Sequence, residues 1–170
     1  MGTSSIAQYQ PVAEPISHDL KVADAVWIAT ALLHRRNPQS GGFSTEAIVA
    51  DVQSLHLTKA AFRSIWQHVN QHCVANREPN PNRTRMLYAI GKGDRRLFRD
   101  GDNYKADREG SPTHPDWNSL PSEYRDLQTW YETEWNHSTE DPLLALIGSG
   151  KDIWTDEHAD EYVKRLREEW

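Results

Sequence analysis

The fold is decided by residues 85–99, whose sequence is RMLYAIGKGDRRLFR. Residues 86–90 are apolar or aromatic, as in a strand, and residues 97–98 return to an apolar pair. Between them, Gly91-Lys92-Gly93-Asp94 has the glycine content of a tight turn. The segment therefore predicts a β-hairpin with strands at 85–90 and 95–99.

Three stretches upstream of the hairpin carry apolar residues at helical spacing. The first begins at Leu20 and should end at the break Asn37–Pro38. The second should be capped by Ser44 and reach His56. The third should be capped by Thr58, with an inward apolar stripe made of Phe62, Ile65, Trp66, Val69 and Cys73. Three helices followed by a hairpin are typical of the winged helix-turn-helix layout, so we expect a mainly α fold with a small β-hairpin.

The remaining segments differ from this domain in composition. Residues 1–15 lack periodicity and are expected to form a flexible arm, followed by a winged-helix domain at 16–108. Residues 109–140 are predicted to be an irregular connector with an aromatic helix from about Glu123 to Trp135. Residues 141–170 are predicted to form an extended helical tail with a glycine hinge, whose apolar side suggests a binding partner.

Charge is segregated along the chain. The net charge is −6, but residues 73–108 hold nine basic and five acidic side chains, and residues 109–170 hold five basic and fifteen acidic ones. A basic middle segment beside an acidic tail predicts two different partners, or a tail that shields the basic surface.

The basic residues fall into two groups that suit double-stranded DNA. One is a row on the third predicted helix, spaced by four, four and three residues: Lys59, Arg63, Gln67 and Asn70. The other is the cationic hairpin, with Arg85, Lys92, Arg95, Arg96 and Arg99. A solvated helix face and a structural hairpin are the alternatives for the two groups.

The sequence offers no catalytic constellation. Gly148-Ser149-Gly150-Lys151 lacks the Ser or Thr and the first glycine of a phosphate-binding loop, and His68, His72 and Cys73 have no second cluster with which to hold a metal. We therefore expect neither an enzyme nor a bound cofactor. A single cysteine and the lack of a long apolar run favour a cytoplasmic location without membrane association.

Two resemblances extend these expectations. Residues 57–69, 85–90 and 97–102 resemble an uncharacterised bacterial winged-helix family found near restriction and toxin genes. Residues 141–167 resemble the C-terminal segment of VapB-type antitoxins, which neutralise PIN-domain ribonucleases, although those proteins usually carry a ribbon-helix-helix or swapped-hairpin DNA module.

The second resemblance implies a toxin-binding role for the tail. It implies that Leu143, Leu144 and Trp154 fill the toxin's groove and that Arg165 or Arg167 approaches its acidic metal site. The other apolar residues expected at that interface are Ile153, Tyr162 and Leu166.

The leading hypothesis is thus an antitoxin of a type II system that also binds operator DNA. The alternatives are a free-standing winged-helix transcription regulator or restriction-associated DNA-binding protein, whose tail serves to form a homodimer, and a protein-interaction module that does not touch DNA.

Overall fold

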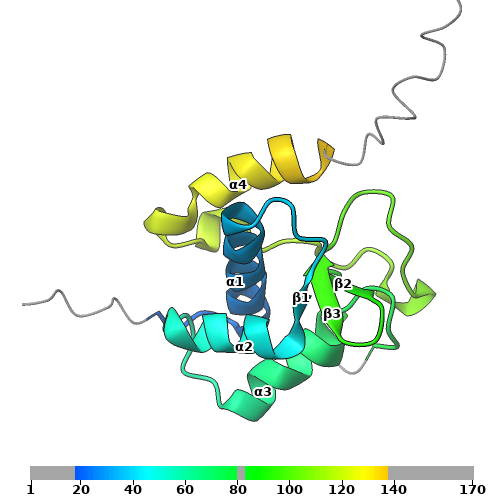
Figure 1. The fold of residues 1–170 in the computed structure, drawn as a ribbon, viewed down its shortest axis with the longest axis horizontal. Helices are drawn as coiled ribbons and strands as arrows, with labels where there is room; N and C mark the ends of the chain where they lie inside the picture. The colour runs from blue at the N-terminus through cyan, green and yellow to red at the C-terminus, as the bar shows by residue number, and fades with distance from the viewer. Residues whose placement is uncertain (1–17, 80–82, 138–170) are drawn as a thin grey trace, which may run out of the picture. The chain divides into compact units, whose positions relative to one another are not determined.

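The computed structural model describes residues 18–79 and 83–137. The chain divides into two compact units, residues 1–129 and residues 130–170. In the first unit the described residues form a mainly helical domain with a small antiparallel sheet (Figure 1). The expected mainly α architecture with a β-hairpin is confirmed at this level.

The principal elements follow one another in the order α1 (Val22–Arg36), β1 (Phe43–Ser44), α2 (Thr45–Ser54), α3 (Phe62–Gln67), β2 (Leu87–Ile90), β3 (Asp94–Leu97) and α4 (Asp126–Trp130). A π-helical turn at His68–His72 directly follows α3. Short 3-10 turns occupy Ala106–Arg108, Trp117–Ser119 and Ser122–Tyr124.

The first two helices begin and end close to the predicted residues. α1 ends at Arg36, before the predicted break. The Ser44 hydroxyl accepts a hydrogen bond from the Ala47 N–H at 3.2 Å, which is the predicted cap of α2. α2 ends at Ser54, and His56 has a left-handed φ of 51°, so the helix is slightly shorter than predicted.

The sheet has three strands in the order β1-β3-β2, all antiparallel. Asp94 pairs with Ile90, so the turn is only Gly91–Gly93, and Gly91 has the positive φ of 62° that the turn requires. β1 was not predicted. It pairs Phe43 with Arg95, and a Cβ placed on the preceding Gly42 would lie 3.0 Å from the Arg95 carbonyl oxygen.

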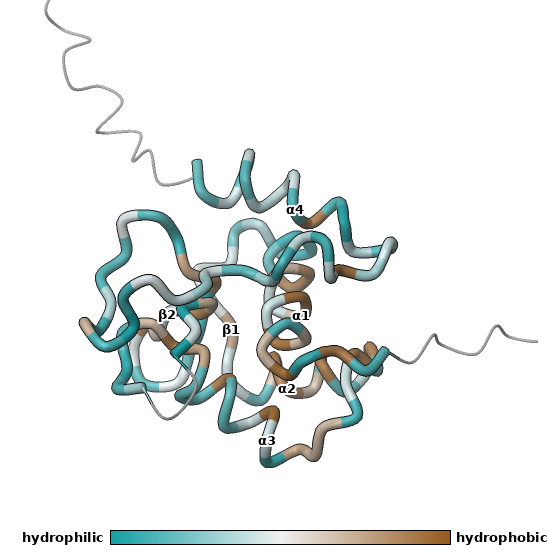
Figure 2. Tube along the Cα trace, turned by 180° about the vertical axis from the view of Figure 1, so that it is seen from behind, coloured by the Kyte–Doolittle hydropathy of each residue, from teal (hydrophilic) through white to brown (hydrophobic). Residues whose placement is uncertain are grey.

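The core lies between α1, α2, α3 and the inner face of the sheet. Fully buried side chains come from each element: Trp27 and Ile28 from α1, Ile48 from α2, Ile65 from α3, Leu87 from β2 and Leu97 from β3. Each such side chain contributes about 1.5–3 kcal/mol when removed from water. Hydrophobic colouring accordingly follows much of α1, whereas the loops beyond the sheet are largely hydrophilic (Figure 2).

The predicted aromatic helix is divided among three kinds of helical turn. Ser122–Tyr124 is a 3-10 turn, and α4 follows after one residue. In the second unit, a π-helical turn spans Tyr131–Trp135, and the ring of Trp135 lies 5.8 Å from that of Trp130, which precedes the turn. No helix among the described residues is long and apolar enough to cross a bilayer.

Candidate nucleic-acid interface

α3 presents a polar face to solvent. Ile65 and Val69, four residues apart, point into the core, so the opposite side of the helix faces solvent. Arg63 and Gln67 are exposed and lie one turn apart on this face.

Two details of this helix differ from the prediction. Thr58 does not cap α3, because the helix begins at Phe62 and the Thr58 hydroxyl instead accepts the Ala60 N–H at 3.3 Å. Phe62 does not belong to the inward stripe, since 55% of its side chain is exposed.

Only part of the predicted row stands free on the surface. Lys59 precedes the helix and is exposed, 3.8 Å from Asp19. Asn70 lies in the π-helical turn, where the spacing differs from that of an α-helix, and its side-chain oxygen accepts hydrogen bonds from Arg95 at 2.9 Å and Arg77 at 3.1 Å. Asn70 therefore acts as an internal hydrogen-bond acceptor in place of the base contact predicted for it.

Arg95 points into the domain. Only 1% of the residue is exposed, and its guanidinium donates to Val69 O, Asn70 Oδ1 and Asp94 O. Burial lowers its pKa to about 10, with a further contribution from nearby Arg77. Arg95 cannot contact a phosphate in this structure, so this assignment is corrected.

Other hairpin cations also make internal contacts. Arg96 forms two hydrogen bonds of 2.7 Å with Asp102 and lies 4.5 Å from the centre of the Tyr88 ring. Arg85 donates to Ser111 O and lies 4.2 Å from the Tyr104 ring centre. Most arginines of the predicted cationic hairpin thus make contacts within the domain and are not free to bind a ligand.

Arg99 and Lys92 complete the predicted set. Arg99 is half-buried, and burial lowers its pKa, as does Arg96 beside it. Lys92 is exposed in the turn between β2 and β3. Of the nine predicted DNA-contact residues, the structure leaves Lys59, Arg63, Gln67 and Lys92 exposed.

The sequence around α3 contains no carboxylate. Between Asp51 and Glu78 there is no acidic residue, although the chain has 25 of them. Lys59 and Arg63 both lie in this acid-free segment. Lys59 is paired with Asp19, so exposed Arg63 is the cation that makes the face of α3 positive within a protein of negative net charge, which suits a polyanionic ligand.

Sequence reasoning missed a buried arginine outside the hairpin. Arg108 has no solvent exposure, and it donates to the carbonyls of Gln71, His72, Arg77 and Thr84 at 2.7–2.9 Å. No local pattern indicated these contacts, because they join segments more than twenty residues apart.

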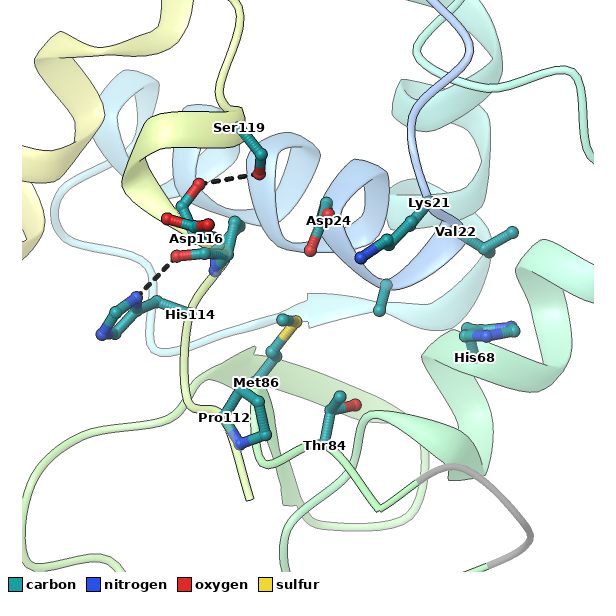
Figure 3. A pocket seen from close by; sticks show the side chains of 12 residues that line it. Lys21, Val22, Asp24, His68, Thr84, Met86, Pro112, His114, Asp116 and Ser119 are labelled. Atoms are coloured by element: carbon teal, nitrogen blue, oxygen red, sulfur yellow. Dashed lines mark hydrogen bonds between the residues drawn. The ribbon is translucent and has the colours of Figure 1, made fainter. Parts of the chain in front are cut away.

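A cavity of about 580 Å³ lies beside the start of α1 (Figure 3). Its charged lining residues are Lys21, Asp24 and Asp116, and His68 and His114 also line it. Burial raises the pKa of Asp24, Lys21 opposes the shift, and Asp116 adds to it. Any ion bound there would be attracted by one of these charges and repelled by the other, because Lys21 is positive and the two carboxylates are negative. The cavity therefore indicates no particular class of ligand.

The histidines near Cys73 lie in the π-helical turn after α3. The rings of His68 and His72 lie 4.9 Å apart, and His68 Nδ1 donates to Ser64 O at 2.8 Å. Burial raises the pKa of the Cys73 thiol to about 12, so the thiol is protonated at neutral pH. Among residues 18–79 and 83–137, no three His, Cys, Asp or Glu side chains form a group that could hold a metal ion.

The predicted flexible arm and toxin-binding tail fall outside the described residues. This applies to all of the tail residues named above: Leu143, Leu144, Ile153, Trp154, Tyr162, Arg165, Leu166 and Arg167. Comparisons with protein-family models, curated proteins and solved structures gave no match.

Proposed function

We propose that this protein binds double-stranded DNA through the exposed face of α3. The observation that carries the proposal is the pairing of exposed Arg63 and Gln67, one turn apart, in a segment without a carboxylate. Arginine suits guanine or phosphate, and glutamine suits adenine, when a helix lies in the major groove.

The order of the elements supports a winged helix-turn-helix assignment. Three helices are followed by a hairpin, and a short strand between the first two helices pairs with the second strand of that hairpin. In this layout α3 is the recognition helix, and the turn that holds Lys92 touches the adjacent backbone.

Substitution of the exposed polar residues of α3 tests the proposal. Double-stranded DNA of random sequence is titrated with the full chain, with Arg63→Ala and with Gln67→Ala in gel-shift assays. Arg125→Ala is the matched control, because it removes an exposed cation from a different segment. Arg63→Ala should weaken binding markedly and Arg125→Ala should not. Equal effects of the two arginine substitutions, or no binding by the wild type, would reject the proposal.

The acidic tail supports a second proposal, carried by the sequence alone. Its charge and apolar residues, together with the antitoxin resemblance, support binding of residues 141–170 to a PIN-domain ribonuclease. DNA binding by α3 would then serve operon autoregulation. The alternative is a transcription regulator or restriction-associated protein without a toxin partner.

Co-purification distinguishes the two roles. The tagged chain is expressed from its native operon with its neighbouring genes, and its partners are identified by mass spectrometry. The antitoxin proposal predicts a stoichiometric PIN-like protein that is lost when residues 141–170 are deleted. Recovery with DNA but without such a protein would favour the regulator.

A further inference from the structure

An ordered aromatic pair lies on the exposed face of α3. Phe62 is the exposed large hydrophobic side chain among the described residues, with 55% of it accessible. Its ring stacks on Trp66, with centroids 6.0 Å apart and 28° between the planes. Trp66 is half-buried, and the phenyl ring that stacks on it remains exposed at the surface.

The surroundings of Phe62 identify the kind of surface that it fits. Arg63 is its exposed neighbour, Gln67 lies on the same helix, and the whole segment between Asp51 and Glu78 lacks a carboxylate. Charge complementarity therefore favours a polyanion as the ligand. The exposed phenyl ring in addition favours a polyanion that carries an apolar group. In the major groove of DNA, that group is the C5-methyl of thymine.

We infer that Phe62 contacts thymine C5-methyl groups in the major groove, so that the protein distinguishes thymine from uracil under α3. This inference rests on the proposed DNA binding and adds the base feature that α3 reads. The contact needs no hydrogen bond, because removing the apolar surfaces of the phenyl ring and the methyl group from water is itself favourable in free energy. Arg63 and Gln67, which share the neighbouring row of the helix, would supply the polar contacts beside it.

The first test leaves the protein unchanged and measures how its Kd responds to removal of single methyl groups from the DNA. The full chain selects duplexes from a random pool, and each thymine of a selected duplex is replaced in turn by uracil, which lacks only the methyl group. At contacted positions the Kd should rise about fourfold per methyl. Because the wild-type protein is used, misfolding of a variant cannot explain this result.

Variants then assign the methyl contact to Phe62. In Phe62→Ala the affinities for thymine and uracil duplexes should become equal, whereas Phe62→Leu, which keeps an apolar side chain, should retain part of the difference. Thermal unfolding of both variants checks that the domain remains folded.

The outcomes separate this inference from the proposed function. If no DNA is selected or bound, the proposed function itself fails. If DNA binds but uracil has no effect, or if Phe62→Ala responds to uracil as the wild type does, only the thymine-methyl inference is overturned. A change of oligomeric state in Phe62→Ala without any methyl effect would assign Phe62 to a contact between copies and would also overturn it.

Discussion

Arg108 donates hydrogen bonds to four backbone carbonyls from a position without solvent exposure. Two of these carbonyls, Gln71 O and His72 O, lie at the end of the π-helical turn after α3, where Gln71 O also accepts the Val74 N–H at 3.1 Å. A charged donor makes stronger hydrogen bonds than a neutral one. The guanidinium therefore fixes the end of this π-helical turn to the loop that follows the sheet.

Arg108→Met should destabilise the domain by at least about 3 kcal/mol, because several buried carbonyls lose a charged donor. Urea denaturation measures the change in the free energy of unfolding. Arg63→Met serves as the control, since Arg63 is exposed and its loss should change stability by less than about 0.5 kcal/mol. Similar midpoints for Arg108→Met and the wild type would contradict the structural role.

His34 makes stability depend on pH. The side chain is buried in edge-to-face contact with Phe43, and burial lowers its pKa to about 4, helped by nearby Arg99 and Arg96. Between the ordinary pKa of 6.5 and about 4, the unfolded chain binds a proton at this residue and the folded chain does not. Unfolding is therefore favoured as the pH falls through this window.

The effect of His34 should reach about 3 kcal/mol at pH 4, since one pKa unit corresponds to 1.36 kcal/mol. His34→Gln removes the titrating group, so its stability should fall less steeply between pH 6.5 and 4. Denaturant titrations at several pH values compare the two slopes. The prediction fails if the wild type and the variant lose stability in parallel.

Strand alternation decides which hairpin arginines reach solvent. Successive residues of a strand point to opposite faces, and Leu97 must point into the core, so Arg95 does so as well. Arg96 lies on the other face with Asp102. Arg95 and Arg96 therefore cannot act together on one ligand.

The chain just before β1 approaches the hairpin closely at Gly42. A Cβ at Gly42 would lie 2.4 Å from Ile90 Cδ1 and 3.0 Å from the Arg95 carbonyl oxygen. Gly42→Ala should therefore cost about 1–3 kcal/mol by overpacking. Gly41→Ala is the matched control, because a Cβ there meets nothing within 4 Å. Thermal unfolding of the two variants should differ clearly, and equal midpoints would contradict the described packing.

Local patterns were sufficient for much of the helical framework and for the hairpin. Ser44 capped a helix as predicted because capping depends on neighbouring residues. β1 could not be predicted, since two residues carry no periodicity and their pairing with β3 is long-range. For the candidate site, the alternation that buries Arg95 was available in the sequence, whereas the π-helical turn that redirects Asn70 was not.

At the scale of the whole molecule, a protein of negative net charge exposes a few cations on and near α3 and in the turn between β2 and β3. The exposed cations of the proposed interface are Lys59, Arg63 and Lys92, and the remaining predicted cations mostly hold the domain together. Electrostatic attraction to DNA should therefore be moderate. Three phosphate contacts would give a log–log salt slope of about −3 per chain.

The most direct test of DNA binding by α3 is the salt dependence of the Kd, measured by fluorescence anisotropy with a labelled duplex and the full chain. DNA binding by α3 should give a slope of about −3 per chain for the wild type, and a slope smaller in magnitude by about one for Arg63→Ala. Salt-independent binding, or a slope that Arg63→Ala leaves unchanged, would contradict the claim that this face of α3 contacts DNA.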